Sequence, residues 1–141
     1  MEKNSFIIEM VHDWPKEQIV ELYKSGGWWE EHYDSEGLDA LIKGSFAFAV
    51  AVEASTGLAI GMGRAISDGV SDAWLQDIVV LDDYRKRGVG RAIIKKLLEY
   101  CQMKNLGWIG LVAEPGTKDF YKPLGFDELP GEPMVYKKKE C

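Results

Sequence analysis

Residues 74–101 read WLQDIVVLDDYRKRGVGRAIIKKLLEYC, and this stretch decides the fold. Its first part, Trp74–Leu81, is rich in apolar and β-branched residues, as is typical of a strand. After a short basic turn that contains glycines, the apolar residues recur at helical spacing, at Val89, Ile93 and Leu97. The stretch therefore predicts a buried strand that turns sharply into a long amphipathic helix.

Further strands are predicted by short runs of β-branched and aromatic residues at Phe6–Val11, Phe46–Val52, Leu58–Ile66, Trp108–Ala113 and Met134–Lys137. Four helices are predicted: one capped by Asp13 and ending near Gly26, one capped by Asp34 or Ser35 and ending at Gly44, the long helix ending at Gly107, and a short one at Thr117–Tyr121. The resulting order, β-α-α-β-β-β-α-β-α-β, predicts an α/β fold. We expect one mixed, mostly antiparallel sheet of about six to seven strands flanked by helices.

Length and composition predict one soluble domain spanning residues 1–141, with 46% hydrophobic and 28% charged residues. A net charge of −6 argues against a nucleic-acid partner, which would require a basic face. No apolar run approaches the roughly 18–20 residues that span a bilayer, and a signal-peptide pattern is missing, so no membrane partner is expected. Cys101 and Cys141 have neither metal-ligand nor disulfide spacing, which predicts a cytoplasmic location and no metal site.

The turn Arg85–Arg91, with the sequence RKRGVGR, carries the strongest chemical signal. Its glycines let the backbone fold tightly at a helix start, where unpaired amides, the helix dipole and adjacent cations favour an anion such as pyrophosphate. A plain strand-to-helix connection with solvated charges is the other open interpretation. Dinucleotide-binding and Walker loops are excluded, because Ile93 replaces the small third residue of the first and the chain has no Gly-Lys-Ser/Thr sequence for the second.

Two segments resemble the Gcn5-related N-acetyltransferases (GNATs), which transfer acetyl from acetyl-CoA to amines. The family's acetyl-CoA loop has the pattern Gln/Arg-x-x-Gly-x-Gly/Ala, which Arg85, Gly88 and Gly90 match. Phe120–Phe126, FYKPLGF, looks like the family's Phe-Tyr-x-x-x-Gly-Phe segment. The two segments stand in the family's order, and the predicted elements agree with the family fold over essentially the whole chain.

The resemblance implies that acetyl-CoA is the acyl donor. Its pyrophosphate would be held by the turn residues Arg85, Lys86, Arg87, Gly88, Val89, Gly90 and Arg91, chiefly through backbone amides. Its pantetheine arm would pair with the preceding strand at Ile78, Val79 and Val80. We expect the amide of Val79 to polarise the thioester carbonyl and to stabilise the oxyanion.

The resemblance also implies an acid and a base. Tyr121 matches the family's general acid, which protonates the departing CoA thiolate, and a phenol is neutral at pH 7 and can donate this proton. The base would take a proton from the attacking ammonium group. Glu114, which precedes Tyr121 by seven residues, is the second candidate for this role.

Asp77 is the first candidate for the base. Gln76-Asp77 is similar to the Glu-Asp pair of glucosamine-phosphate acetyltransferases, and a carboxylate inside an apolar strand is costly without a partner or a function. A buried arginine or a backbone amide could be that partner, so a structural role is open as well. The alternation of a strand places Asp77 on the face of Leu75 and Val79, opposite Gln76 and Ile78.

Aromatic residues occupy the position of the family's acceptor-binding loop, at Trp28, Trp29, His32 and Tyr33. If they are exposed, they could hold an aromatic or aliphatic amine by cation–π contacts, and Gln76 is a further candidate contact. A hydrophobic plug over the sheet edge is the structural alternative for these rings.

The sequence therefore predicts an acetyl-CoA-dependent N-acetyltransferase that acts on a primary amine of a small molecule, such as an arylalkylamine, by direct attack in a ternary complex. Two alternatives are open: a protein or peptide N-acetyltransferase acting on Lys or an N-terminus, and a non-catalytic acyl-CoA-binding sensor. Edge strands of such sheets can pair into a homodimer, and the sequence leaves the oligomeric state open.

Overall fold

The structure is a computed structural model that describes residues 5–137. By its internal contacts the chain divides into two compact units, Met1–Leu111 and Val112–Cys141. Cys141 lies outside the described residues. Within the part of the chain that the structure describes, no helix is both long and apolar enough to cross a lipid bilayer.

The first unit is built on a five-stranded sheet in the order β1-β2-β3-β4-β5. Its strands are β1 (Phe6–Met10), β2 (Ala47–Glu53), β3 (Ala59–Ile66), β4 (Asp72–Val80) and β5 (Trp108–Leu111). The first four are antiparallel neighbours, as the predicted meander requires, and β5 runs parallel to β4. The mixed, mostly antiparallel sheet is confirmed, with five strands among the described residues in place of six to seven.

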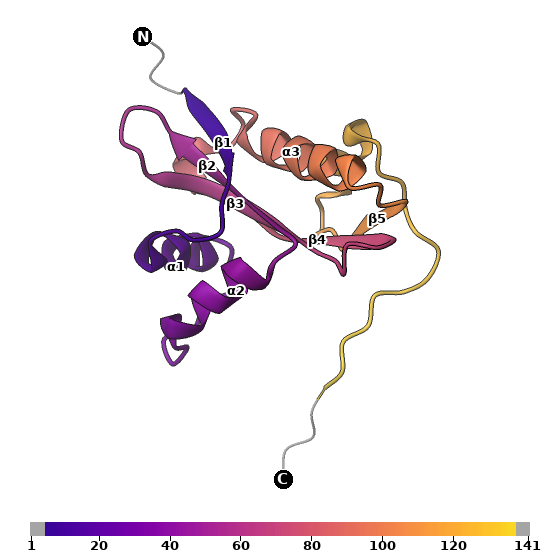
Figure 1. Ribbon diagram of the computed structural model, residues 1–141, viewed down its shortest axis with the longest axis horizontal. Helices are drawn as coiled ribbons and strands as arrows, with labels where there is room; N and C mark the ends of the chain where they lie inside the picture. Colours follow the sequence, from indigo (N-terminus) through magenta and orange to yellow (C-terminus); the bar gives the residue numbers. More distant parts are fainter. Residues whose placement is uncertain (1–4, 138–141) are drawn as a thin grey trace. The chain divides into compact units, whose positions relative to one another are not determined.

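Small and large residues alternate along β2 and β3, and this alternation decides how the helices pack. The large residues of one face are Phe48, Val50, Val52 and Met62. On the other face, Ala49 is the direct partner of Gly63. α3 (Val89–Met103) lies across this small-residue face (Figure 1), where a Cβ on Gly63 would stand only 2.9 Å from Cγ2 of Ile93. The lack of side-chain bulk lets α3 approach the sheet closely.

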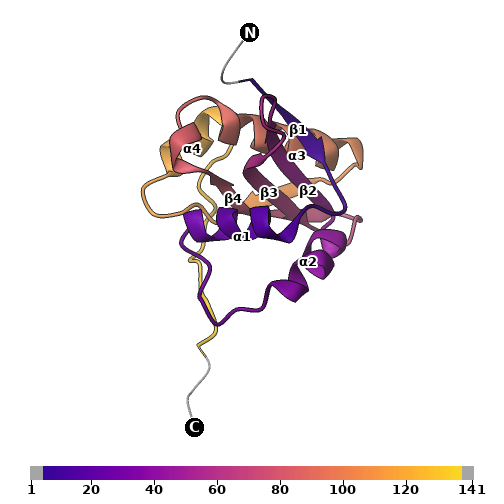
Figure 2. The same ribbon diagram turned by 90° about the vertical axis from the view of Figure 1, so that its left-hand side faces the viewer.

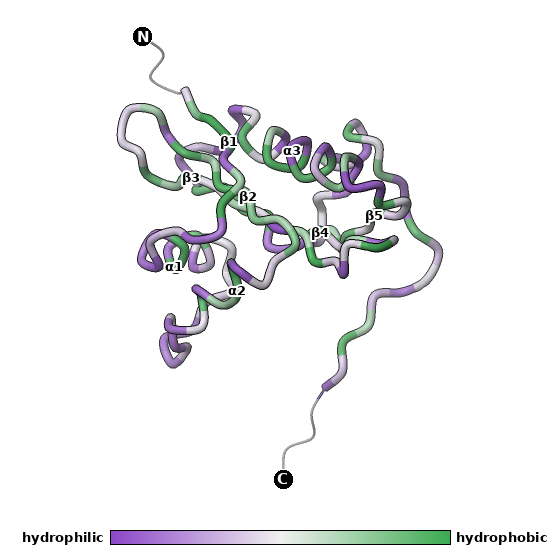
Figure 3. Tube along the Cα trace, in the orientation of Figure 1, coloured by the Kyte–Doolittle hydropathy of each residue, from purple (hydrophilic) through white to green (hydrophobic). Residues whose placement is uncertain are grey.

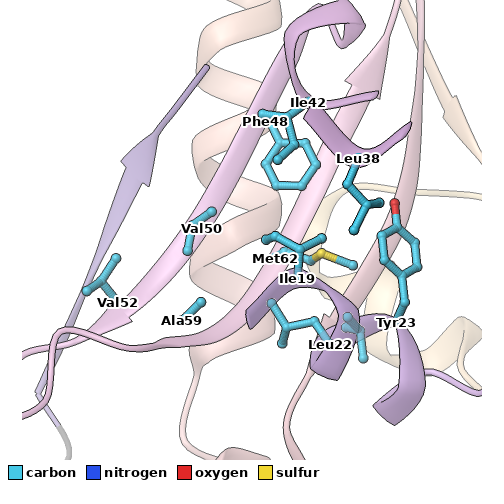
Figure 4. Packing of buried hydrophobic residues seen from close by; sticks show 11 residues of the cluster. Ile19, Leu22, Tyr23, Leu38, Ile42, Phe48, Val50, Val52, Ala59 and Met62 are labelled. Atoms are coloured by element: carbon cyan, nitrogen blue, oxygen red, sulfur yellow. The ribbon is translucent and has the colours of Figure 1, made fainter. Parts of the chain in front are cut away.

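The main hydrophobic core lies on the opposite face, beneath α1 (Lys16–Ser25) and α2 (Leu38–Gly44), and Figure 2 shows α1 running across the strands. Figure 4 shows the side chains that meet there, among them Ile19, Leu22, Tyr23, Leu38, Ile42, Phe48, Val50 and Met62. In Figure 3, β1 and β2 are largely hydrophobic, whereas hydrophobic and hydrophilic residues alternate along the helices. Each helix therefore turns an apolar stripe to the sheet.

Three helix boundaries differ from the sequence expectation. α1 is capped by Pro15 in place of Asp13, because the fixed φ of proline suits a helix start. α3 ends before the expected Gly107, because Asn105 adopts a left-handed conformation (φ 64°) that terminates helices. Asp34 caps the 3₁₀ turn at Ser35–Gly37 in place of α2, and its side chain accepts a hydrogen bond from the backbone N–H two residues further on. α2 itself begins after Gly37, without a side-chain cap.

The second unit contains α4 (Lys118–Tyr121), as predicted, followed by a 3₁₀ turn at Lys122–Leu124. Further 3₁₀ turns lie in the first unit at Ser35–Gly37 and Asp82–Tyr84. The strand predicted at Met134–Lys137 is wrong: these residues form no strand, and Met134 is 93% exposed. Pro133 supplies no backbone donor, and so short a run does not form a stable strand without a ladder partner.

We expect Gly63→Ala to lower the free energy of unfolding by about 1–3 kcal/mol, the usual cost of overpacking a core. The added Cβ would stand 2.5 Å from Cδ1 of Ile78 and 2.9 Å from Cγ2 of Ile93. Gly44→Ala is the matched control, because its Cβ would meet no atom within 4 Å. Urea unfolding measures both variants, and a Gly63→Ala protein as stable as the wild type would contradict the close packing of this face.

Candidate functional site

β4 contains a β-bulge opposite β3. The register of the two strands shifts between Met62 and Arg64, so that Asp77 and Ile78 together stand opposite the single residue Gly63. Asp77 adopts a left-handed backbone conformation with a φ of 59°, which is uncommon outside glycine and is tolerated by aspartate. A bulge of this kind redirects side chains and backbone amides at one point of a strand.

The bulge changes the faces on which the side chains of β4 lie. Before it, Leu75 is the partner of Ala65 on the face toward α3, and Gln76 is the partner of Arg64 on the opposite face. After it, Asp77 lies on the face of Arg64 and bonds to its side chain. The expectation from strict alternation is therefore wrong for Leu75 and Gln76, because the extra residue shifts the alternation by one position.

Asp77 is held by two hydrogen bonds to one carboxylate oxygen. The Tyr23 hydroxyl and Arg64 Nε each donate to Oδ2 at 2.7 Å. The ion pair is largely shielded from water, since only 15% of the Arg64 side chain and 17% of the Asp77 side chain are exposed. Burial, and then the negative charge of Asp77, raises the pKa of Tyr23 above its ordinary value, so the phenol stays a donor. Oδ1 of Asp77 receives no hydrogen bond from the described residues.

The C-terminal half of β4 has an open edge. β5 pairs only with the N-terminal half, and no other strand among residues 5–137 pairs with this edge. The amide of Leu81 donates to β3 at 2.9 Å, so the amide of Val79, two residues earlier, also faces β3. The amides of Ile78 and Val80 face the open edge. The amide of Val79, for which the sequence predicts the polarising role, therefore does not face the open edge.

The turn after β4 places two left-handed residues, Lys86 (φ 64°) and Gly88 (φ 82°), before α3. Amides in such a turn, at the start of a helix, form a concavity that favours anions. The side chain of Arg85 is committed to the turn itself, because its Nε donates to the Val80 carbonyl at 3.1 Å. Lys86 and Arg91 are exposed cations of the same turn.

An aromatic cluster adjoins the Asp77 carboxylate. The ring of Tyr23 contacts Trp28 and Trp29, with centroids 6.2 Å and 6.3 Å apart, and Trp29 contacts Tyr33 at 5.5 Å. Both tryptophans pack partly against the core, and Tyr33 is exposed. His32 also contacts Tyr33, with centroids 4.8 Å apart, so the structure connects all four predicted aromatic residues through ring contacts.

Tyr23 and Arg64 are not among the site residues singled out from the sequence. The available signal is one charge in the interior of each of two adjacent, mainly apolar strands: Arg64 in AIGMGRAI and Asp77 in DAWLQDIVV, whose other charge, Asp72, stands at the first position of the strand. Apolar strands avoid unpaired charges, so opposite charges in two neighbouring antiparallel strands predict an ion pair between them. Tyr23 gives no comparable signal, because it occupies an ordinary apolar position of an amphipathic helix.

The second unit carries the predicted general acid. The ring of Tyr121 makes edge contacts with Phe120 and Phe126, with centroids 4.9 Å and 5.8 Å away. Burial, and then the charge of Glu114, raises the pKa of Tyr121, so the phenol is protonated at neutral pH. Glu114 is exposed, and its backbone carbonyl accepts hydrogen bonds from the amide and the hydroxyl of Thr117.

The sequence model of the acetyltransferase (GNAT) domain matches residues 44–128. GCN5-related N-acetyltransferase 1, chloroplastic, of Arabidopsis thaliana is 36% identical over 83 residues, which cover 57% of this chain and 42% of the relative. Serotonin N-acetyltransferase 2, chloroplastic, of Oryza sativa subsp. japonica is 38% identical over 72 residues, 51% of this chain and 36% of the relative. Histone acetyltransferase TAP1 of Glycine max is 38% identical over 71 residues, which cover 50% of this chain and 31% of the relative. The chain thus spans less than half the length of these relatives.

Solved structures share the fold. A GNAT-family acetyltransferase from Streptococcus pneumoniae TIGR4 superposes with a TM-score of 0.79 at 24% identity, covering 96% of this chain and 100% of the other. An aminoglycoside N-acetyltransferase in complex with CoA superposes with a TM-score of 0.71 at 22% identity, covering 97% of this chain and 96% of the other. These likenesses confirm the fold expected from the sequence.

We expect the free energy of unfolding to fall less steeply with rising pH in the Tyr23→Phe variant than in the wild type. The phenol ionises near 10.0 when exposed, whereas its raised pKa keeps it protonated in the folded protein. Its contribution to stability is therefore complete below that pH and declines above it, by about 1.4 kcal/mol per pH unit. Urea unfolding from about pH 8 to about pH 11 measures the slope. Tyr136→Phe, at an exposed ring, is the control, and equal slopes for Tyr23→Phe and the wild type would refute the assignment.

Proposed function

The chain belongs to the acetyltransferase (GNAT) family, and on that basis we propose that it transfers the acetyl group of acetyl-CoA to a primary amine of a small molecule. The observation that carries the proposal is that the open edge of β4 leads directly into the amide-rich turn at Gly88. An extended arm with amide groups can pair with such an edge, and a pyrophosphate can occupy such a turn. Acetyl-CoA combines these two chemical features in one molecule.

On the donor side, the roles fall mainly on backbone atoms. The amides of residues 86–91 would surround the pyrophosphate, with the side chains of Lys86 and Arg91 adding charge. The amides of Ile78 and Val80 would bond to the thioester and the pantetheine arm, and the Ile78 amide would stabilise the oxyanion. An aminoglycoside N-acetyltransferase of the same fold binds CoA, which supports this assignment of the donor.

The proposed reaction is a direct transfer in a ternary complex. The amine nitrogen, after losing its extra proton to a carboxylate, attacks the thioester carbonyl carbon and forms a tetrahedral intermediate, whose oxyanion accepts a hydrogen bond from the Ile78 amide. The intermediate collapses with cleavage of the C–S bond, and the nitrogen releases its second proton, which restores the Tyr121 hydroxyl after it has protonated the thiolate. The departing thiolate takes a proton from Tyr121. Asp77 is the first candidate for the base, because its Oδ1 receives no hydrogen bond from the described residues, and Glu114 is the second.

The acceptor side favours a cation with an apolar or aromatic body. Asp77 supplies a negative charge beside the rings of Tyr23, Trp28 and Trp29, which suit cation–π contacts. The net charge of −6 adds a weak attraction for cations. The rice relative is named for serotonin, an aromatic amine, and the soybean relative is named for histones, so a protein lysine is the second candidate acceptor.

The test of the proposal follows thiol release from acetyl-CoA with arylalkylamines, polyamines, aminosugars, amino acids and a lysine peptide. We expect release with arylalkylamines above all other classes. Gly88→Val should abolish release and CoA binding, because valine cannot adopt a φ of 82° without strain, and a change of this φ would redirect the amides of the turn. Gly57→Val, at a φ of 75° in the β2–β3 turn, controls for backbone strain alone.

Three results would count against this assignment. Release with the lysine peptide alone would move the acceptor to a protein. CoA binding without release for any amine would favour the sensor. A Gly88→Val protein that binds CoA like the wild type in calorimetry would remove the pyrophosphate from the turn.

We expect Tyr121→Phe to lower kcat by about 10- to 100-fold while leaving the affinity for acetyl-CoA nearly unchanged. The hydroxyl acts on the leaving group only as the C–S bond breaks, so its loss affects the transition state and spares ground-state binding. Tyr136→Phe, in the same unit, removes an exposed hydroxyl and serves as the control. Parallel losses of kcat and of acetyl-CoA affinity in Tyr121→Phe would argue that the ring only supports the binding site.

A further inference from the structure

We propose that Arg64 and Tyr23 are positioning residues that aim the backbone amide of Ile78 by holding Asp77 in its left-handed conformation. The inference rests on the proposed function, since it assigns a task to the amide that would polarise the thioester carbonyl. Neither side chain faces the open edge of β4, so both act through Asp77.

The first step of the argument is the backbone strain at the bulge. A left-handed aspartate is less stable than an extended one, and such a conformation persists only where its surroundings fix it. The peptide between Asp77 and Ile78 sets the direction of the Ile78 amide. If Asp77 relaxed to an extended conformation, this peptide would rotate, and the amide would no longer point along the open edge.

The second step is that the bulge is fixed from both faces of the sheet. On the face toward α3, Cδ1 of Ile78 lies over Gly63, within 2.5 Å of the position that a Cβ would occupy there. On the opposite face, Tyr23 and Arg64 converge on one oxygen of Asp77, each at 2.7 Å. Packing holds one of the two bulge residues, and charge-assisted hydrogen bonding holds the other.

The third step is that this clamp reaches both helices of the acceptor side. Tyr23 belongs to α1, and Arg64 Nη1 also donates to Oγ of Ser45, the residue that caps the C-terminus of α2, at 3.4 Å. The ring of Tyr23 contacts Trp28 as well. Groups that would surround the acceptor are thus connected, through one carboxylate, to the amide that would activate the donor.

The test uses the chain of residues 1–141 and its variant Arg64→Met, which keeps side-chain length and removes the donors. We expect kcat to fall by about 10- to 100-fold, part of the loss that follows removal of an oxyanion donor, while the affinity for CoA stays within about twofold. Infrared difference spectra with carbonyl-labelled acetyl-CoA supply a direct readout. The carbonyl stretch of the bound thioester should move back toward its value in solution, because the hydrogen bond from Ile78 is weakened.

Lys16→Met is the matched control, because it removes the Lys16–Glu36 ion pair of the same unit without touching the bulge, and it should resemble the wild type. Arg64→Lys restores the charge and should recover part of kcat. Should Arg64→Met fail to fold, Tyr23→Phe removes one hydrogen bond of the clamp and should shift the same carbonyl band in the same direction.

Two outcomes would overturn the inference and leave the proposed function standing. One is a folded Arg64→Met or Tyr23→Phe protein with the wild-type carbonyl band, and the other is a loss of kcat in these variants that is matched by an equal loss of CoA affinity. A wild-type protein that neither binds acetyl-CoA nor releases thiol would overturn the proposed function, and the inference with it. Both the proposed function and the inference are supported if the wild type turns over and the carbonyl band shifts in Arg64→Met and Tyr23→Phe but not in Lys16→Met.

Discussion

The bulge in β4 is the constraint on which the candidate site depends. One extra residue opposite Gly63 turns Asp77 toward α1, sends Ile78 toward α3, and aims alternate amides at the open edge. In a regular strand the same residues would alternate without interruption, and Asp77 and Gln76 would lie on opposite faces. The open edge of β4 and the aromatic cluster around Tyr23 therefore meet at a single irregularity of one strand.

Much of this architecture could be predicted from the sequence, because it depends on local patterns. The change from strand to helical spacing between β4 and α3 is visible within a few residues, and so is the turn between them. The glycines that this turn needs also carry the family resemblance, which the match over residues 44–128 confirms. Asp77 was predicted with two open interpretations, and the structure supplies the partner, Arg64, that the structural one required.

The bulge itself could not be predicted, since it is decided by residues that are distant in the sequence. Asp77 is fixed by Arg64, 13 positions away, and by Tyr23, 54 positions away. No local pattern indicates a left-handed aspartate, so the sequence alone does not show that the Val79 amide faces β3. The same limit applies to Met134–Lys137, because β-propensity cannot supply the neighbouring strand that a ladder requires.

The two faces of the sheet differ in how well they tolerate side-chain substitutions. α3 rests on backbone and on small side chains such as Ala49 and Gly63, so almost any larger residue there would push against the helix that begins at the glycine turn. The face beneath α1 and α2 is filled by larger side chains that can be exchanged for others of similar volume. Evolution or an engineer can therefore change the side chains around Trp28 and Trp29 while the packing of α3 on the sheet stays intact.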